Sequence, residues 1–270
     1  MKSAITISLV PQARGGPFVF WDGLAQGCEE AAASGFDAVE IFPSSANALD
    51  AAELGQLLAR HKLRVAAVGT GGGWVVQKLS LTNPDPSVRA QAKEFIRGII
   101  DLAAALHAPA VLGSMQGRWE APGSRDQAVC WLGEGLRELD THAGKHRQVL
   151  LYEPLNRYET NLFNRLVEAA KFLEGLGTQN VRLLADLFHM NIEEASIPDA
   201  LRAAGRHVGH VHFADSNRLA MGLGHTSVAP IIEALREIGY EGYLSAEILP
   251  LPNSETAARQ TIQSIRKYTA

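Results

Sequence analysis

Four segments in the second half of the chain decide the fold: LLYEPLNRYET (150–160), LLADLFHMN (183–191), HVHFADSNR (210–218) and SAEILP (245–250). In each of them an apolar run ends at an acid or an imidazole. A run of this kind is typical of a buried strand, and an unpaired charge buried at the end of a strand is costly. A divalent cation held by several of these side chains would compensate them together. The segments therefore predict buried strands that end at a metal site.

The rest of the chain repeats this alternation of a short apolar run and an amphipathic stretch. Strands are expected at 4–10, 38–42, 64–70, 109–115, 149–153, 181–186, 209–215 and 243–248. Helices are expected around 22–34, 50–61, 87–107, 125–144, 163–177, 197–205, 228–239 and 254–268. Apolar strands joined by helical crossovers predict a parallel sheet, and eight repeats in 270 residues favour a closed barrel.

We therefore expect an α/β protein, a single (β/α)8 TIM-barrel domain over residues 1–270. The alternative is an open, doubly wound sheet that binds a dinucleotide. GTGGGW (69–74) begins like the glycine-rich loop of such a sheet, but Trp74 stands where the third glycine is needed. The closed barrel is the preferred prediction.

The composition narrows the class of protein. The chain is 46% hydrophobic and 20% charged with a net charge of −4, and it has no run rich in lysine or arginine. This argues against a nucleic-acid partner. The two cysteines, Cys28 and Cys130, are far apart, which fits a reducing compartment. MKSAITISLV (1–10) is typical of a first strand rather than a signal peptide, and no apolar stretch is long enough to cross a membrane. We expect a cytoplasmic protein.

The candidate metal ligands are Glu153, Asp186, His212 and Glu247, which fall at or near the ends of strands five to eight. In a TIM barrel the active site forms at the carboxyl ends of the strands, so these side chains would share one half of the barrel mouth. Three carboxylates and one imidazole favour Mn²⁺, with Mg²⁺ or Co²⁺ as alternatives, over Zn²⁺. In a near-octahedral site they leave about two positions for neighbouring substrate oxygens, such as those of a hydroxy-ketone.

Such a metal would polarise a carbonyl and stabilise the enolate formed when the adjacent carbon loses a proton. Glu153 and Glu247 lie on strands that straddle the metal, so one could remove the proton while the other returns one to the opposite face. His189 lies three residues beyond Asp186, where a loop could turn its ring toward the carbonyl oxygen. These positions predict inversion of the carbon next to a carbonyl.

Three further side chains are candidates for supporting roles. Glu159 and Arg218 are expected on loops, where they would bind substrate hydroxyls or a carboxylate. His210 shares strand parity with His212 and would support it from one layer deeper in the barrel. Less specific interpretations stay open: an acid at a strand end often caps a loop, His210 could be a hydrogen-bonded core residue, and Arg218 could neutralise Asp215.

Trp74 and Trp119 follow strands three and four. They could form a wall of a sugar pocket, or they could be partly buried packing residues. The placement of four potential ligands on four successive strands is what favours the metal site over a set of unrelated caps and ion pairs.

Several of these motifs resemble those of a known family: EPLNRYET (153–160), ADLFHMNIEE (185–194), HVHFADSNR (210–218), GLGH (222–225) and IIEALREIGYEGYLSAE (231–247). They are similar to the xylose-isomerase-like TIM barrels, in the branch of the ketose 3-epimerases, and most to the 5-keto-L-gluconate epimerase type. The resemblance extends from about residue 60 to 252. The loops at 14–21 and 116–124, which usually shape the sugar pocket of the family, follow no pattern that we can assign.

The resemblance implies a divalent-metal enzyme, commonly a homodimer or homotetramer. It implies that Glu153 and Glu247 bind the metal and act as the acid–base pair, and that Asp186 and His212 complete the metal site. Substrate contacts are implied for three residues: Glu159, His189 and Arg218.

The expected function is therefore a metal-dependent epimerase that inverts the carbon next to the carbonyl of a ketose or keto-sugar acid through an enediolate. The main alternative is an aldose–ketose isomerase of the hydroxypyruvate or inosose isomerase type, and a dehydratase is another. An abasic-site endonuclease is disfavoured because it needs several zinc ions, more histidines and a basic face. A sugar-binding module without turnover would not need both glutamates.

The class of sugar stays open at this point. LPLPNSE (249–255) has no basic residue, which disfavours a phosphorylated substrate. Arg218, with Arg157 and Arg118 in nearby loops, makes a carboxylated keto-sugar plausible, and a free ketose is equally possible.

Overall fold

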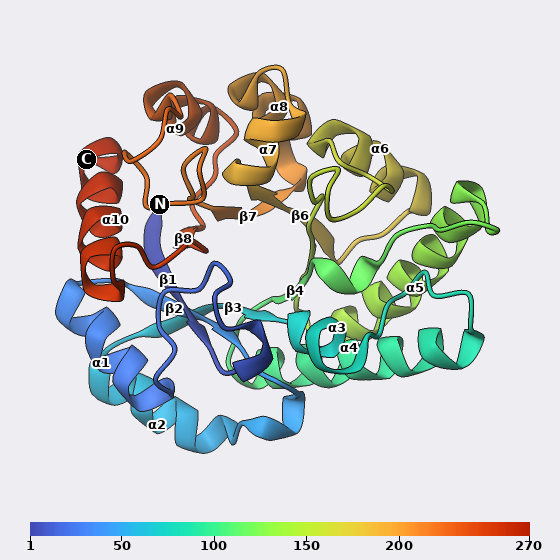
Figure 1. The fold of residues 1–270 in the computed structure, drawn as a ribbon, viewed down its shortest axis with the longest axis horizontal. Coiled ribbons are helices and arrows are strands. Elements are labelled where there is room, and N and C mark those ends of the chain that lie inside the picture. Colours follow the sequence, from blue (N-terminus) through green and yellow to red (C-terminus); the bar gives the residue numbers. More distant parts are fainter.

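The computed structural model describes residues 1–270 and forms a closed barrel of eight parallel strands surrounded by helices (Figure 1). The strands pair in chain order, and β8 closes the barrel on β1. Their bounds are β1 Lys2–Ser8, β2 Ala38–Phe42, β3 Arg64–Gly69, β4 Ala110–Leu112, β5 Leu150–Tyr152, β6 Val181–Asp186, β7 Val208–His212 and β8 Tyr243–Ala246. The predicted fold class, a single (β/α)8 barrel, is confirmed.

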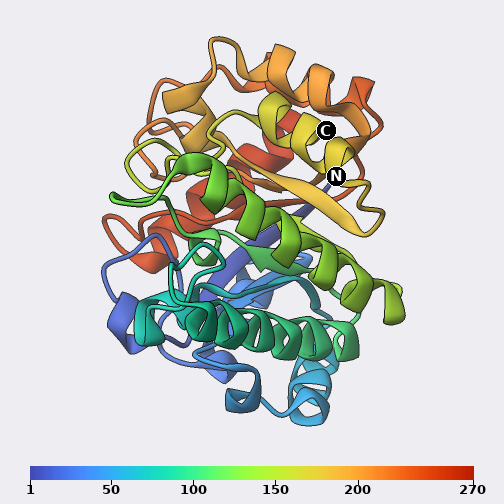
Figure 2. The same cartoon turned by 90° about the vertical axis from the view of Figure 1, so that its right-hand side faces the viewer.

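The helices form an outer wall, and Figure 2 shows them in a side view of the barrel. Their bounds are α1 Leu24–Ser34, α2 Ala51–His61, α3 Gly71–Gln77, α4 Pro86–Ala105, α5 Arg125–Lys145, α6 Leu166–Leu176, α7 Leu187–Glu193, α8 Ile197–Ala204, α9 Val228–Glu237 and α10 Ser254–Thr269. No helix combines the length and the apolar character that a membrane span requires.

Two short helices, α3 and α7, were not predicted. Each is inserted between a strand and the main helix that follows it, in a segment where we expected a loop. The sequence of α3, GGGWVVQ, starts with three glycines, which are poor helix formers, so its pattern did not indicate a helix. Trp74 therefore lies on a helix rather than in a loop.

The observed strand ends place the predicted ligands at one rim of the barrel. Asp186 and His212 are the last residues of β6 and β7, while Glu153 and Glu247 directly follow β5 and β8. Strands β4 and β5 have three residues each, fewer than expected. The carboxyl ends of parallel strands point the same way, so the four side chains start from neighbouring points.

The strands are buried on both sides, because the helices cover the outside and side chains fill the interior. One cluster of 65 buried hydrophobic residues forms the main core. Within this apolar interior, Glu40 stands near the middle of β2 with no exposed surface. A buried carboxylate requires hydrogen-bonding or charged partners, and those of Glu40 are His210 and His212 of the candidate metal centre.

Candidate metal centre and active site

The four predicted ligands converge at the carboxyl end of the barrel. The ligand atoms of Glu153, Asp186, His212 and Glu247 lie within 4.8 Å of one another, and none of these residues is more than 7% exposed. His212 Nδ1 lies 3.3 Å from Asp186 Oδ2, 3.6 Å from Glu153 Oε1 and 3.7 Å from Glu247 Oε2. The imidazole thus faces three carboxylates across one small space.

The other ring nitrogen of His212 is held by Glu40, whose carboxylate lies between two imidazoles. His212 Nε2 is 3.0 Å from Glu40 Oε1, and His210 Nε2 is 2.9 Å from Glu40 Oε2. A proton on His212 Nε2, donated to Glu40, leaves the lone pair of Nδ1 directed at the three acids, which is how an outer carboxylate orients a metal-binding histidine. His210, predicted one layer deeper, shares this carboxylate.

Glu40 was missed from the sequence, although a signal for it was present. It is the one charged residue in AVEIF (38–42), a run in which every residue is buried. An acid inside a buried strand must find a partner, so its position alone marked it as a candidate. The partner, on the distant strand β7, was not visible in the sequence.

The electrostatics of the cluster call for a cation. Burial, together with the neighbouring carboxylates of Glu153 and Asp186, raises the pKa of Glu247 to about 7 against the opposing effect of His212 and Arg218. Glu153 Oε1 and His189 Nε2 are buried without a hydrogen-bond partner. Crowded carboxylates with an unsatisfied oxygen fit a divalent cation, whose preferred ligands are of this kind.

Asp186 serves the site in two ways. Its Oδ1 caps α7 by accepting hydrogen bonds from the backbone N–H groups of Phe188 (2.8 Å) and His189 (3.2 Å), while its Oδ2 faces the centre. The cap starts a helix immediately after β6, so His189 lies on α7 and not in a loop as predicted. The helix brings His189 Nε2 to 3.8 Å from both Glu153 Oε1 and Asp186 Oδ2.

Asn156 orients the ring of His189 through a hydrogen bond, and it is a second residue that sequence reasoning missed. Its Nδ2 donates to His189 Nδ1 at 2.7 Å and lies 3.1 Å from Glu159 Oε1. A neutral imidazole that accepts at Nδ1 carries its proton on Nε2. His189 therefore presents an N–H donor to the centre, and Asn156 links it to Glu159.

Arg218 reaches into the centre from the loop after β7. Its Nη2 lies 2.6 Å from Glu247 Oε2 and its Nη1 lies 3.6 Å from Glu159 Oε1. The guanidinium also lies over the ring of Phe188, 4.9 Å from its centroid. Its backbone φ is +60°, a value that is uncommon for a residue with a side chain and that the surrounding loop must hold in place. The alternative in which Arg218 neutralises Asp215 is wrong.

Asp215 instead organises the loop that carries Arg218. Its carboxylate accepts four backbone hydrogen bonds, from the N–H groups of Ser216 (2.7 Å), Gly222 (2.7 Å), Gly224 (2.9 Å) and Thr226 (3.0 Å). Although burial opposes the shift, these bonds lower the pKa of Asp215 to about 2. The loop from 215 to 226 is thus folded around one carboxylate.

A cavity of about 160 Å³ opens above the cluster. Its lining includes five side chains that can take part in acid–base or polar contacts: Glu153, Glu159, His189, Arg218 and Glu247. It also includes a set of apolar residues, the apolar wall: Val10, Pro17, Phe18, Phe42, Val75 and Leu155. The loop at 14–21, to which we could assign no pattern, therefore contributes Pro17 and Phe18 to the wall of the cavity.

The two tryptophans singled out from the sequence do not line this cavity. Trp74 and Trp119 border a separate hollow, together with Trp131 and much of the loop at 116–124. Both also pack against the main core. Their interpretation as packing residues fits better than that of a wall of the candidate active site.

Gly113, directly after β4, gives the Glu153 side chain its space. A Cβ atom at this position would lie 2.5 Å from Glu153 Oε2, closer than real contacts allow. Any residue larger than glycine would have to displace the carboxylate or the backbone. Gly113 is a third position that the sequence analysis did not identify.

Comparisons with known proteins identify the family of the chain. Residues 28–268 match the family described as xylose isomerase-like TIM barrel. The chain is 31% identical over 223 residues to the D-psicose 3-epimerase of Enterocloster bolteae, covering 79% of this chain and 73% of the relative. It is also 31% identical over 243 residues to the L-ribulose 3-epimerase of Methylomonas sp. (strain DH-1), covering 86% of this chain and 83% of the relative.

Among solved structures, a D-allulose 3-epimerase from Methylomonas sp. in complex with D-allulose superposes with a TM-score of 0.81 at 25% identity. The alignment covers 99% of this chain and 98% of that one. The whole barrel, including the loops that carry the candidate site, therefore has a counterpart of the same architecture.

We expect Gly113→Ala to weaken metal binding about tenfold or more, because the added methyl group displaces Glu153. Isothermal titration with Mn²⁺ measures the change. The control is Gly175→Ala in α6, where a Cβ meets nothing within 4 Å. Equal Mn²⁺ affinities in the two variants would show that the Glu153 carboxylate can move away from the added methyl group without weakening the metal site.

We expect Asp215→Asn to lower the free energy of unfolding by about 2 kcal/mol at neutral pH, since the folded pKa of Asp215 is about 2 against a usual 3.8. A depressed pKa gives stability that is present above the unfolded pKa and lost as the pH falls through the folded one. The difference from the wild type should therefore shrink between about pH 4 and pH 2. Urea unfolding measures it, with Asp22→Asn as an exposed control. A loss that does not vary with pH would contradict this origin.

Proposed function

Because the chain belongs to the xylose isomerase-like TIM-barrel family, we propose that it is a divalent-metal-dependent sugar epimerase that inverts the carbon next to the carbonyl of a ketose. The observation that carries the proposal is the pair Glu153 and Glu247, which approach one centre from β5 and β8 with Asp186 and His212 between them. Relatives named as 3-epimerases of D-psicose and L-ribulose support the same class of reaction.

The metal would be held by Glu153, Asp186, His212 and Glu247. Three hard carboxylate ligands and one imidazole favour Mn²⁺, with Mg²⁺ or Co²⁺ as alternatives and Zn²⁺ less suited. When bound, this ion supplies polarisation of the substrate carbonyl and stabilises the negative charge that develops on its oxygen. Glu153 Oε1 is buried without a hydrogen-bond partner, which supports its assignment as a metal ligand.

The proton transfers belong to the two glutamates. One carboxylate takes the proton from the carbon beside the carbonyl, and the electron pair of the broken C–H bond moves into the carbonyl to give an enediolate. The other glutamate, in its acid form, gives its proton to the same carbon from the opposite face, which inverts the centre. The protein thus ends with the two protonation states exchanged.

His189 and Arg218 would hold the substrate during this exchange. His189 Nε2–H has no partner within the protein and faces the centre, so it is free to donate to a substrate oxygen. Glu159 borders the same cavity and could accept from a substrate hydroxyl. The carbon chain of the sugar would contact the apolar wall at Phe18 and Phe42.

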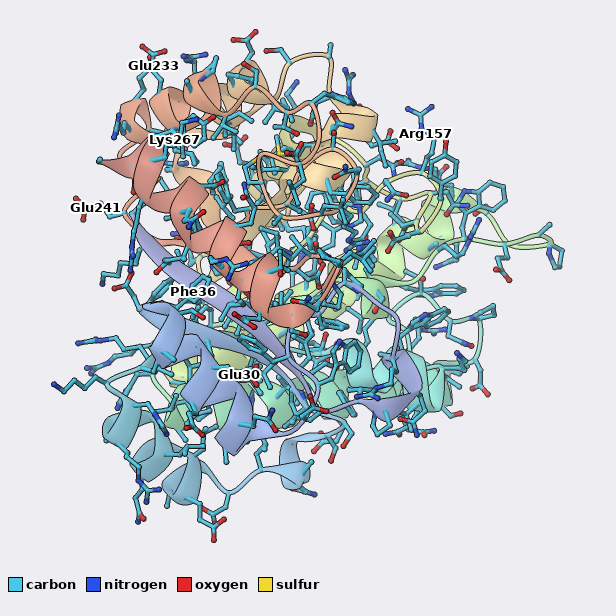
Figure 3. All side chains as sticks on the ribbon, turned by 60° about the vertical axis from the view of Figure 1, so that its left-hand side comes forward. Glu30, Phe36, Arg157, Glu233, Glu241 and Lys267 are labelled. Carbon is cyan, nitrogen blue, oxygen red and sulfur yellow. The ribbon has the colours of Figure 1, made fainter.

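The charges around the cavity favour an uncharged ketose over a keto-sugar acid. Arg218 is the only arginine or lysine that lines the cavity, and it is already paired with Glu247 and Glu159. Arg157 is exposed, points away from the barrel and is paired with Glu193 (Figure 3). Arg118 borders the separate hollow. Apart from the metal, a substrate carboxylate would therefore meet several glutamates and no arginine or lysine that is free of an acidic partner.

We further expect a cytoplasmic homodimer or homotetramer that has no nucleic-acid or membrane partner. Aldose–ketose isomerisation uses the same two glutamates and metal but delivers the proton to the neighbouring carbon. The experiment below distinguishes the two reactions.

The deciding experiment is NMR in D₂O with free ketoses and a keto-sugar acid as substrates. We expect deuterium at the carbon beside the carbonyl together with the epimeric ketose, loss of both after EDTA treatment, and recovery with Mn²⁺. Free ketoses should react faster than the acid because Arg218, the one arginine that lines the cavity, is already paired with Glu247 and Glu159. Formation of an aldose would identify an isomerase, and full activity of metal-free protein would refute the metal mechanism.

We expect Glu247→Gln to abolish epimerisation, with a loss of about 10²- to 10⁴-fold, because one of the two faces loses its proton carrier. The variant should still exchange the proton of one epimer with D₂O through Glu153, without converting it into the other. Glu241→Gln, on the exposed surface before β8, is the matched control (Figure 3).

Two measurements make this result interpretable. Metal analysis of the variant separates loss of the proton carrier from loss of the ion, and circular dichroism checks the fold. Interconversion of both epimers at a rate near that of the wild type would remove Glu247 from the mechanism.

A further inference from the structure

Three potential metal ligands meet on the outer wall of the barrel, in a place unrelated to the candidate active site. Asp101 lies near the end of α4, His142 lies in the last turn of α5, and His146 ends that helix. His142 Nε2 is 2.6 Å and His146 Nε2 is 2.8 Å from the same oxygen, Asp101 Oδ1. Each ring therefore directs its Nε2 atom at Asp101 Oδ1.

Helix geometry explains this convergence. Residues four apart lie on the same face of a helix, so His142 and His146 project side by side from α5. The same seam between α4 and α5 carries a different pairing one turn earlier, where Glu138 binds Lys93 at 2.7 Å and Arg97 at 3.0 Å. There, cations on α4 meet an acid on α5. One turn later the acid, Asp101, is on α4. The side chains that face it from α5 are the imidazoles of His142 and His146, which bind metals when neutral.

We propose that Asp101, His142 and His146 form a second metal site, with a preference for Zn²⁺, Ni²⁺ or Cu²⁺. Two imidazole nitrogens and one carboxylate suit these borderline cations better than Mn²⁺ or Mg²⁺. The three ligand atoms lie within 4.8 Å of one another. Metal–ligand distances of about 2.0–2.2 Å require them to separate only slightly, because two ligands of a tetrahedral ion are about 3.3 Å apart.

The surroundings of the three side chains leave room for an ion from solvent. The exposed fractions of the side chains are 51% for Asp101, 18% for His142 and 36% for His146. Water can complete the coordination, as in other sites with three protein ligands. Both helices end at the amino-terminal face of the barrel, so a bound ion would join α4 to α5 on the side opposite the candidate active site. The proposal does not depend on the proposed function.

The test is isothermal titration with Zn²⁺ of protein stripped of metal. A Cys130→Ser background removes the exposed thiol of Cys130, a potential zinc ligand in its own right. We expect two sites in this parent protein. His142→Gln/His146→Gln should lose one, with its dissociation constant raised more than about 100-fold, since loss of even an outer partner costs a metal site about 10- to 100-fold. Asp186→Asn should lose the other site and keep this one.

Two further variants make the result decisive. His207→Gln is the matched control, because His207 also binds an acid, Glu174 at 3.0 Å, but has no second histidine beside it. Asp101→Asn tests the carboxylate without removing either ring, and circular dichroism checks that each variant folds. Zinc should also raise the melting temperature of the parent and the His207 variant more than that of the double variant. An unchanged zinc count and affinity in both the double variant and Asp101→Asn would overturn the proposal.

Discussion

The candidate site depends on the buried hydrogen bond between His212 Nε2 and the carboxylate of Glu40. Neither side chain has exposed surface, and each would be very costly to bury alone. Although burial opposes the shift, His212 and His210 lower the pKa of Glu40, so the carboxylate stays ionised in the barrel interior. The pair fixes which nitrogen of His212 faces the three acids, and thereby decides that the cluster can accept a cation. Removing Glu40 would leave two imidazoles without their orienting partner.

The fold and the four candidate ligands could be predicted because both depend on patterns that are local in sequence. Each strand is a short apolar run, and each ligand stands at the end of one, so a topology of eight such repeats brings the ends to one rim. Asp186 and His212 end their strands as expected. This part of the prediction needed only the apolar runs that mark the strands and the rule that a TIM barrel forms its active site at the carboxyl ends of the strands.

The residues that were missed are defined by contacts across the fold. Glu40 is recognised by its partners on β7, 170 residues or more away. Asn156 matters because α7 places His189 beside it, and α7 itself begins only because Asp186 caps it. Gly113 is required because of where the Glu153 carboxylate comes to rest. Such requirements arise from packing between elements, which the hydrophobic pattern of one segment does not contain.

The cavity is built from two different parts of the chain. The side chains with acid–base chemistry come from β5 to β8 and their loops. All of the apolar wall except Leu155 comes from the first third of the chain: Val10, Pro17, Phe18, Phe42 and Val75. Val10, Pro17 and Phe18 even precede residue 28, where the match to the family begins. Substrate range and reactivity thus draw mainly on different stretches of the chain, but Glu40 on β2 joins them because it holds the imidazole of His212. A chimaera joined between β3 and β5 would therefore keep the orientation of His212 only if its first part supplied a glutamate at position 40.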